Sequence, residues 1–309
     1  MILRTKIILL LLFSVVLCAG VFFSYKIYRK YQAVREEQVI LERRRAAWSH
    51  LERALQNKIR NFRGTVGLVI EDLNTEWEIS FNKDTLIPSA SLVKVPLMLA
   101  CFYAADDGKI NLGDEVHIKP SEIVAGSKEL GNKASGSAFT VEELFRPMIT
   151  ESDNTAANAL INLLGFDASN GYFKRMGLKN TNISRKMLDF SKRREGEENY
   201  TTAQDMAYLL EGLYHESILN KDVSKKCMEL LGQQKINDRI PKKLPRGTIV
   251  AHKTGLEKYV CHDAGIVFTD KGNFLICVLT KHNDKFSRST KKFISDVTLL
   301  TYNYYRDLY

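Results

Sequence analysis

The stretch "SASLVKVPLM", residues 89–98, decides how this chain is interpreted. It places Ser91 and Lys94 three residues apart, immediately before an apolar run. If a helix begins here, residues at positions i and i+3 lie on the same face of it. A serine hydroxyl is a weak nucleophile until a nearby base takes its proton. The pair is therefore either a nucleophile with its base or two polar residues at a helix start.

The same Ser-x-x-Lys spacing occurs twice more, at residues 80–83 and 289–292. The first of these copies lies in a predicted strand, where residues three apart point to opposite faces. The second lies in a charged stretch. Only the pair at Ser91 and Lys94 sits at a predicted helix start.

Two further motifs follow along the chain. Residues 152–154 read Ser-Asp-Asn, in a predicted turn before a helix, and residues 253–255 read Lys-Thr-Gly, at the end of a predicted strand. Each alone is an ordinary helix-cap turn or strand end. All three motifs together, in this order, favour a catalytic site.

The order of predicted elements indicates an α+β fold. Residues 64–73 and 76–82 form a predicted hairpin, and strands are predicted again at 247–255, 263–270 and 273–281. Helical patterns fill most of the middle, with a capping-box match at Thr140–Glu143, and the chain ends in a predicted helix at 290–308. The simplest packing joins both chain ends in one antiparallel sheet with flanking helices, and makes the middle a helical lobe.

The three motifs in this order are the signature of class A β-lactamases and penicillin-binding proteins, and residues 48–309 resemble that family. "MITESDNTAANALINLLG" is similar to a class A stretch, in which Asn158 matches a helix asparagine, and "NYTTAQDMAYLL" resembles the segment that closes the family's omega loop. The resemblance implies an α/β part (48–90 and 240–309) and an all-helical part (91–239).

The resemblance also implies roles for the motif residues. Ser91 would be the nucleophile and Lys94 its base, if burial and the nearby cation Lys253 lower the pKa of Lys94. Ser152 would relay a proton to the leaving nitrogen.

Substrate binding would fall to the neighbouring residues of the same motifs. Asn154 would donate its amide to a substrate carbonyl, and Thr254 with Lys253 would hold a carboxylate. Gly255 would let the substrate lie along the strand edge. The backbone N–H groups of Ser91 and Leu256 would form the oxyanion hole.

The sequence departs from the class A pattern at two places. The omega-loop glutamate is expected near residues 186–188, which read Lys-Met-Leu; Asp189 is the nearest acid and a candidate, while Glu195, Glu197 and Glu198 lie in a charge run typical of a solvated face. The usual arginine after Lys-Thr-Gly is also missing. There His262 or Tyr259 would substitute for it, or the histidine is a packed residue beside a strand.

These departures leave three functions open. The first is a serine β-lactamase-like hydrolase that forms an acyl-enzyme with β-lactam amides and deacylates slowly. The second is a penicillin-binding-protein-like peptidase or esterase acting on peptidoglycan peptides or small esters. The third is a non-catalytic sensor of cell-wall peptides or β-lactams. No metal cluster or phosphate loop occurs in the sequence, so we expect no cofactor.

The basic character of the chain lies at its N-terminus. Of the formal net charge of +9 over 309 residues, all falls in residues 1–63, with 13 Lys+Arg against 4 Asp+Glu, and residues 64–309 balance. The balanced body gives no sign of nucleic-acid binding. Uncharged residues 7–25 predict a membrane anchor, with a cleavable signal peptide as the alternative, and 26–47 predict a basic helical stalk.

Two further expectations concern the compartment and the cysteines. The family's substrates lie outside the cytoplasm, so the catalytic domain is expected there, anchored to the membrane, or secreted if residues 1–25 are cleaved. The five cysteines are an odd number at irregular spacing, which predicts buried thiols rather than a disulfide framework.

Overall fold

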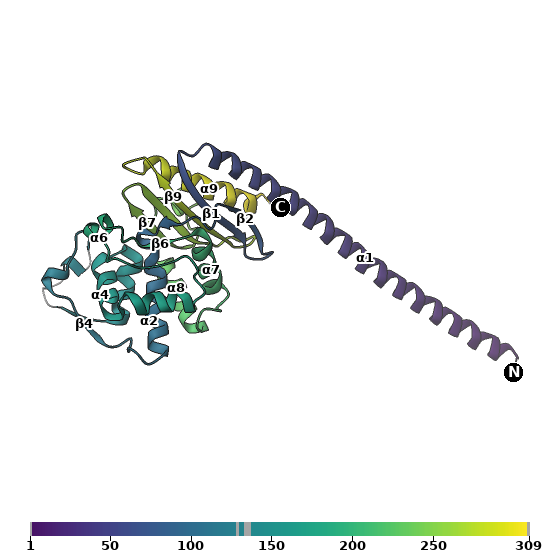
Figure 1. Cartoon of the computed structure of the whole chain (residues 1–309). Coiled ribbons are helices and arrows are strands. Elements are labelled where there is room, and N and C mark those ends of the chain that lie inside the picture. Colours follow the sequence, from purple (N-terminus) through teal and green to yellow (C-terminus); the bar gives the residue numbers. More distant parts are fainter. Residues whose placement is uncertain (1, 128–129, 133–136, 308–309) are drawn as a thin grey trace. The chain divides into compact units, whose positions relative to one another are not determined.

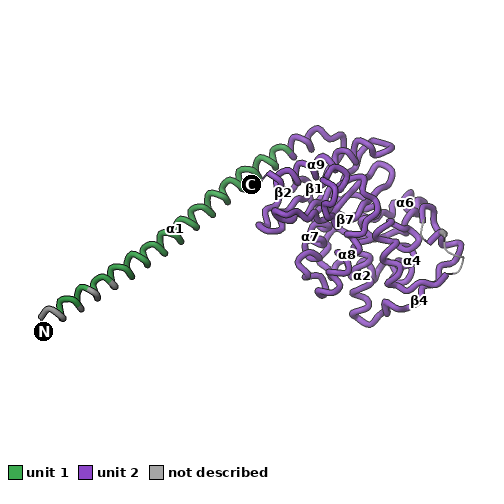
Figure 2. The backbone as a smooth tube through the Cα atoms, turned by 180° about the vertical axis from the view of Figure 1, so that it is seen from behind, with its two compact units in different colours: residues 1–54 green, residues 55–309 purple. Residues whose placement is uncertain are grey.

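The computed structural model describes residues 2–127, 130–132 and 137–307 (Figure 1). The chain divides into two compact units, residues 1–54 and 55–309, coloured separately in Figure 2. Residues 2–54 of the first unit form a single continuous helix, part of α1 (Ile2–Arg60). The second unit contains the sheet, the remaining helices and the three motifs.

The membrane anchor predicted at residues 7–25 is not supported by the structure. These residues are helical, but no helix in the described part of the chain is long and apolar enough to cross a membrane.

The predicted antiparallel sheet from both chain ends is confirmed. Its five strands lie in the order β2-β1-β9-β8-β7, all neighbours antiparallel. The hairpin at the start is also confirmed, with Leu68 opposite Phe81. The strands are β1 (Gly64–Asp72), β2 (Trp77–Phe81), β7 (Val250–Glu257), β8 (Val260–Val267) and β9 (Phe274–His282).

Strands β7 and β8 begin and end differently from the prediction. The apolar runs predicted strands at 247–255 and 263–270, but pairing continues to Glu257 opposite Val260. A tight turn at Lys258 and Tyr259 joins the two strands, with Tyr259 at a φ of 69°. The ladder therefore extends two residues beyond the Lys-Thr-Gly motif and places that motif inside a strand.

Both faces of the sheet are covered by helices. Phe274 of β9 stacks on Tyr305 of α9 (Arg288–Arg306), whereas Leu275 and Cys277 belong to the core that the helices of the middle segment complete. Alternate residues of a strand point to opposite faces, so α9 covers one face and the helical lobe the other, with α7 (Ala203–Tyr214) against β9 and β1 (Figure 1).

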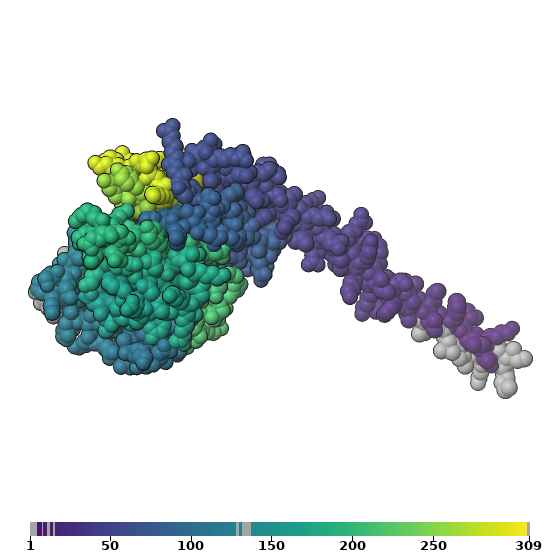
Figure 3. Space-filling model, viewed as in Figure 1, coloured from purple at the N-terminus to yellow at the C-terminus, as the bar shows by residue number. Residues whose placement is uncertain are grey.

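The helical lobe is built around α2 (Lys94–Asp106), whose residues from Lys94 to Ala104 are all buried. A helix that is apolar on every side belongs in a core. In Figure 3 the lobe forms the rounded, mainly teal and green part of the molecule. Its other helices are α3 (Val141–Arg146), α4 (Asn154–Leu164), α5 (Phe166–Arg175), α6 (Phe190–Arg194) and α8 (Lys221–Gly232). The predicted capping box at Thr140 and Glu143 starts α3.

Short strand pairs also form outside the five-stranded sheet. β3 (Ile87–Pro88) pairs with β6 (Tyr200–Thr201), and β4 (Glu115–His117) with β5 (Ala138–Thr140). Cys101, Cys227, Cys261 and Cys277 are buried thiols as predicted, whereas Cys18 is exposed on α1.

Candidate active site

Ser91 lies at the start of the central helix of the lobe. It follows β3 and sits in a 3₁₀ turn, η1 (Ala90–Val93), which leads directly into α2. The preceding residue, Ala90, has a φ of 45°, a left-handed conformation that costs free energy for a residue with a side chain. η1 packs against β7, so the turn brings the half-buried Ser91 to the strand that carries Lys253.

Lys94, the first residue of α2, is completely buried. Its Nζ donates to the carbonyl oxygen of Ser152 at 2.6 Å and to Oδ1 of Asn154 at 2.7 Å, and lies 3.3 Å from Oγ of Ser152. Burial lowers the pKa of Lys94 to about 7, although the charges of Asp153 and Glu257 act in the opposite direction. A large fraction of Lys94 is therefore neutral near pH 7 and able to accept a proton.

Ser152 lies between the two buried lysines. A π-helical turn (Pro147–Glu151) ends at this residue, which has a φ of 62°. Its Oγ is 3.3 Å from Nζ of Lys94 and accepts from Nζ of Lys253 at 3.0 Å. The hydroxyl of Ser152 is thus in hydrogen-bond contact with both amines.

Lys253 is buried within β7. Besides Ser152, its Nζ contacts the carbonyl oxygen of Thr254 at 3.0 Å. Burial holds the pKa of Lys253 well below its usual value, and the positive charges of Lys94 and Arg239 lower it further. Lys253 is therefore deprotonated more easily than an ordinary lysine, and the permanent positive charge that acts on it is that of Arg239.

β7 is the last strand in the order of the sheet, so its outer edge adjoins the site. Thr254 is buried, whereas Leu256 is 47% exposed. A Cβ at position 255 would approach Cδ2 of His262 to 3.0 Å and Leu92 to 3.3 Å, which explains the glycine there. The edge after Lys253 can receive an extended ligand by strand-like pairing.

Two asparagines of α4 act at different places. Asn154 accepts the Lys94 hydrogen bond described above. Asn158 holds the segment before α6, since its Oδ1 accepts from the N–H of Met187 at 2.7 Å and its Nδ2 donates to the Met187 carbonyl at 3.2 Å. One helix thus fixes both the Ser-Asp-Asn turn and residues 186–188.

Comparison with known proteins agrees with this geometry. Residues 50–305 match the model of the "Beta-lactamase enzyme family". The chain belongs to this family.

Individual relatives include β-lactamases and the protein PBP-A. Beta-lactamase VEB-1 of Pseudomonas aeruginosa is 25% identical over 280 residues, covering 84% of this chain and 92% of that protein. Among solved structures, PBP-A is 27% identical, with a TM-score of 0.75 over 84% of this chain and 96% of that chain. A β-lactamase from Sphaerobacter thermophilus is 29% identical, with a TM-score of 0.74 over 84% and 97%.

The segment where the family resemblance places a glutamate offers no carboxylate. Residues 186–188 are Lys, Met and Leu, and Leu188 has a φ of 64°. Asp189 is partly exposed and caps α6, where its Oδ1 accepts from the N–H of Lys192 at 3.1 Å and from Oγ of Ser191 at 2.6 Å. The described hydrogen bonds of Asp189 therefore belong to the helix start rather than to Ser91 or Lys94.

His262 is a buried link between strands. Its Nδ1 accepts from the N–H of Thr280 at 3.0 Å, so its Nε2 carries the proton and donates to the carbonyl oxygen of Pro88 at 2.8 Å. Burial lowers the pKa of His262 to about 4, which keeps the ring neutral at pH 7. This geometry ties β8 to β3, just before Ser91. Tyr259 lies exposed in the β7–β8 turn.

Sequence reasoning missed Arg239. Its guanidinium is buried, its Nε lies 3.2 Å from Sγ of Cys261, and its charge lowers the pKa of Lys253. The family pattern places an arginine after the Lys-Thr-Gly motif, whereas Arg239 precedes it. A single arginine in a loop carries no periodic or motif signal.

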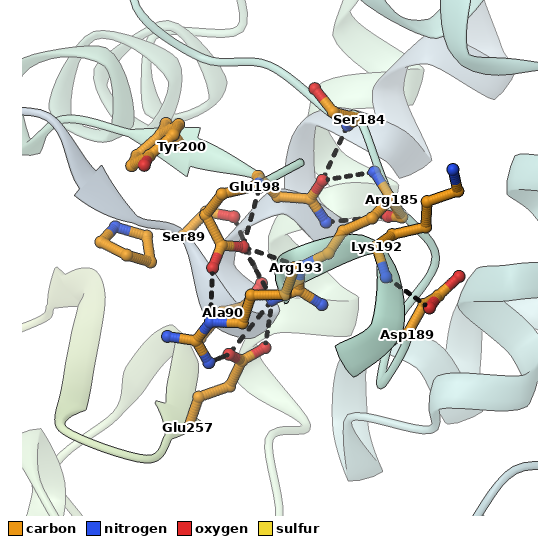
Figure 4. A network of polar contacts seen from close by, with 12 residues as sticks. Ser89, Ala90, Ser184, Arg185, Asp189, Lys192, Arg193, Glu198, Tyr200 and Glu257 are labelled. Atoms are coloured by element: carbon orange, nitrogen blue, oxygen red, sulfur yellow. Dashed lines mark hydrogen bonds and ion pairs between the residues drawn. The ribbon is translucent and has the colours of Figure 1, made fainter. Parts of the chain in front are cut away.

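The charge run before β6 was also misread in part. Glu195 and Glu197 are exposed as predicted, but Glu198 is only 7% exposed. It is buried because it pairs with Arg185 and Arg193, whose side chains surround it in Figure 4.

Proposed function

We propose that this chain is a serine β-lactamase-like hydrolase, in which β-lactam amides acylate Ser91 and the acyl-enzyme is hydrolysed slowly. The observation that carries the proposal is the convergence of two buried lysines on Oγ of Ser152, with Lys94 on the same helical segment as Ser91. A neutral, buried lysine beside a helix-start serine is a base poised for nucleophilic catalysis.

In the proposed acylation, neutral Lys94 takes the proton from Oγ of Ser91 as this oxygen attacks the β-lactam carbonyl carbon. The ring C–N bond breaks, and Ser152 passes a proton to the leaving nitrogen while receiving one from the lysine pair. The N–H groups of Ser91 and Leu256 stabilise the developing oxyanion.

Positive charge would hold the substrate carboxylate. Lys253 and Thr254 contact it directly in this proposal, while Arg239 adds to the field that lowers the pKa of Lys253. Asn154 would donate from its Nδ2 to the substrate's side-chain carbonyl, while its Oδ1 accepts from Lys94. Arg239 would in this way supply positive charge from before the Lys-Thr-Gly motif, where the family has an arginine after it.

Slow deacylation follows from residues 186–188. General-base help by a positioned side chain is worth about 10²–10⁴-fold in rate, and neither this segment nor the capping carboxylate of Asp189 supplies it. The acyl-enzyme should therefore accumulate. Because such substrates lie outside the cytoplasm, we place the catalytic domain, residues 48–309, there as well.

A penicillin-binding-protein-like peptidase or esterase is the second candidate. It is favoured by the same lack of a carboxylate at 186–188 and by the likeness to PBP-A, which also has a solved variant described as an acyl-enzyme complex with penicillin G (27% identical, TM-score 0.76).

Steady-state turnover separates the two candidates. We expect slow benzylpenicillin hydrolysis that Ser91→Ala abolishes. Ser289→Ala, in the exposed Ser-x-x-Lys copy at 289–292, should hydrolyse benzylpenicillin at the wild-type rate. Turnover of small esters or peptidoglycan peptides at least tenfold faster than that of benzylpenicillin would favour the peptidase or esterase instead.

A further inference from the structure

Four charged residues form a closed ring beside the site (Figure 4). Arg185, which is 1–2% exposed, donates through Nε to Oε1 of Glu198 at 2.9 Å and through Nη2 to both carboxylate oxygens of Glu257 at 3.1 and 3.2 Å. Arg193 bonds to the same two carboxylates, with distances of 3.0 Å to Glu198 and 2.9 Å to Glu257. Two arginines thus neutralise two glutamates; we call these residues the ion-pair ring.

The ring joins two parts of the chain that are far apart in sequence. Arg185, Arg193 and Glu198 belong to the segment 184–199, whereas Glu257 is the last residue of β7. Glu257 directly follows Leu256, whose N–H we assign to the oxyanion hole. A displacement of the segment would therefore also shift the end of β7, which carries this N–H donor.

Hydrogen bonds to Asn199 join the two ends of the segment 184–199 and connect it to Ser89, two residues before Ser91. Oδ1 of Asn199 accepts from the N–H groups of Ser184 and Arg185 at 2.7 and 3.0 Å. The carbonyl oxygen of Asn199 accepts from the N–H of Ser89 at 2.7 Å. The segment thus touches the site on two sides, at Ser89 and at Glu257.

We propose that Glu257 is a positioning residue, which holds the segment 184–199 against the end of β7 and thereby fixes the N–H of Leu256 relative to Ser91. This proposal rests on the proposed function, since it assumes that Ser91 is acylated. Glu257 acts through the two arginines and does not touch the substrate.

Burial makes the ring sensitive to the loss of one member. Removing one partner of a buried ion pair leaves an uncompensated charge and is strongly destabilising. Glu257 is 12% exposed in its side chain, and Arg193 is the member nearest solvent at 32%. Glu257→Gln keeps the shape but removes the charge, so Arg185 and Arg193 lose their attraction to β7 and the segment is released.

The charge of Glu257 also acts on Lys94, the proposed base. The charged groups that act on Lys94 from the packed elements are Asp153 before α4, and Lys253 and Glu257 on β7. Asp153 and Glu257 raise the pKa of Lys94. Neutralising Glu257 should therefore shift the acid limb, the pH range in which the acylation rate falls as Lys94 is protonated, to lower pH. Mere loosening of the fold does not produce this shift.

The test measures full-length wild type, Glu257→Gln and Glu195→Gln in two ways. Hydrogen exchange of residues 184–199 is followed without ligand, and Ser91 acylation by benzylpenicillin is followed by quenched intact-mass spectrometry from pH 5.5 to 8.5. Glu195 is the matched control, because it forms an exposed ion pair with Lys192 on the same segment without reaching β7. Arg193→Gln breaks the same link from the solvent side if Glu257→Gln does not fold.

We expect Glu257→Gln to speed exchange in the segment at least tenfold, to slow acylation at pH 8 about tenfold, and to shift the acid limb downward. Glu195→Gln should match wild type in each respect. The proposal would be overturned if residues 184–199 of Glu257→Gln exchange hydrogen at the wild-type rate and the acid limb of its acylation profile stays at the wild-type pH. If wild type forms no adduct, the proposed function fails, and exchange alone decides whether Glu257 holds the segment.

Discussion

Lys94 has two competing influences on its charge: burial, which favours the neutral amine, and the carboxylates of Asp153 and Glu257, which favour the ammonium ion. Burial has the larger effect, and the pKa of Lys94 is about 7. Lys94 accepts a proton only when it is neutral, so its ability to act as a base rises with pH through this value.

We therefore predict that acylation of Ser91 rises with pH, falling roughly tenfold per unit below pH 7 and levelling above it. Stopped-time intact-mass measurements between pH 5 and 9 give this profile. Lys94→Ala should slow acylation about 10²–10⁴-fold at pH 8. A flat wild-type profile through pH 7 would mean that another group, or none, removes the proton.

Individual residues differed in how far the sequence could predict them. Ser91, Lys94, Ser152 and Lys253 could be singled out because short motifs keep their internal spacing. Hydrogen bonds join Lys94, Ser152 and Lys253, and the turn that carries Ser91 packs against β7. Arg239 could not be found, because its place depends on how the chain before β7 folds back onto Cys261. Glu198 looked solvent-exposed because its two arginine partners become neighbours only in the folded chain.

At the scale of elements, we propose that the segment before α6 governs how long the acyl-enzyme lasts. Asn158 fixes Met187 in place, and Asp189 uses its carboxylate to cap α6. An asparagine caps a helix about as well as an aspartate, so Asp189→Asn removes the charge with little effect on the helix.

We expect Asp189→Asn to leave the lifetime of the benzylpenicillin adduct unchanged within about twofold. The decay of the acylated mass after removal of free drug measures this lifetime. An adduct in Asp189→Asn that persists about 10²-fold longer than in wild type would identify Asp189 as the deacylating base.

Element types were easier to predict than element ends. The strands of the final hairpin and the capping box of α3 follow from local patterns. The end of β7 does not, because pairing across the Lys258–Tyr259 turn extends the ladder to Glu257 beyond the apolar run. That extension places Glu257 within reach of Arg185 and Arg193.

At the scale of the whole molecule, the candidate site lies where the inserted helical segment meets the sheet that both chain ends build. The sheet takes strands from both ends, and the inserted helical segment supplies Ser91, Lys94 and Ser152, while β7 supplies Lys253. The order of elements was sufficient to predict this arrangement. The excess positive charge of residues 1–63 lies outside the motifs, and the rest of the chain is electrically balanced.

The central claim is that Ser91 forms a covalent acyl-enzyme with a β-lactam. Intact-mass spectrometry of the full chain mixed with benzylpenicillin, followed over time beside Ser91→Ala, tests it most directly. We predict that wild type gains the mass of one benzylpenicillin and loses it slowly, whereas Ser91→Ala gains nothing. An unchanged wild-type mass with no hydrolysed drug, or an adduct that also forms on Ser91→Ala, would contradict the account.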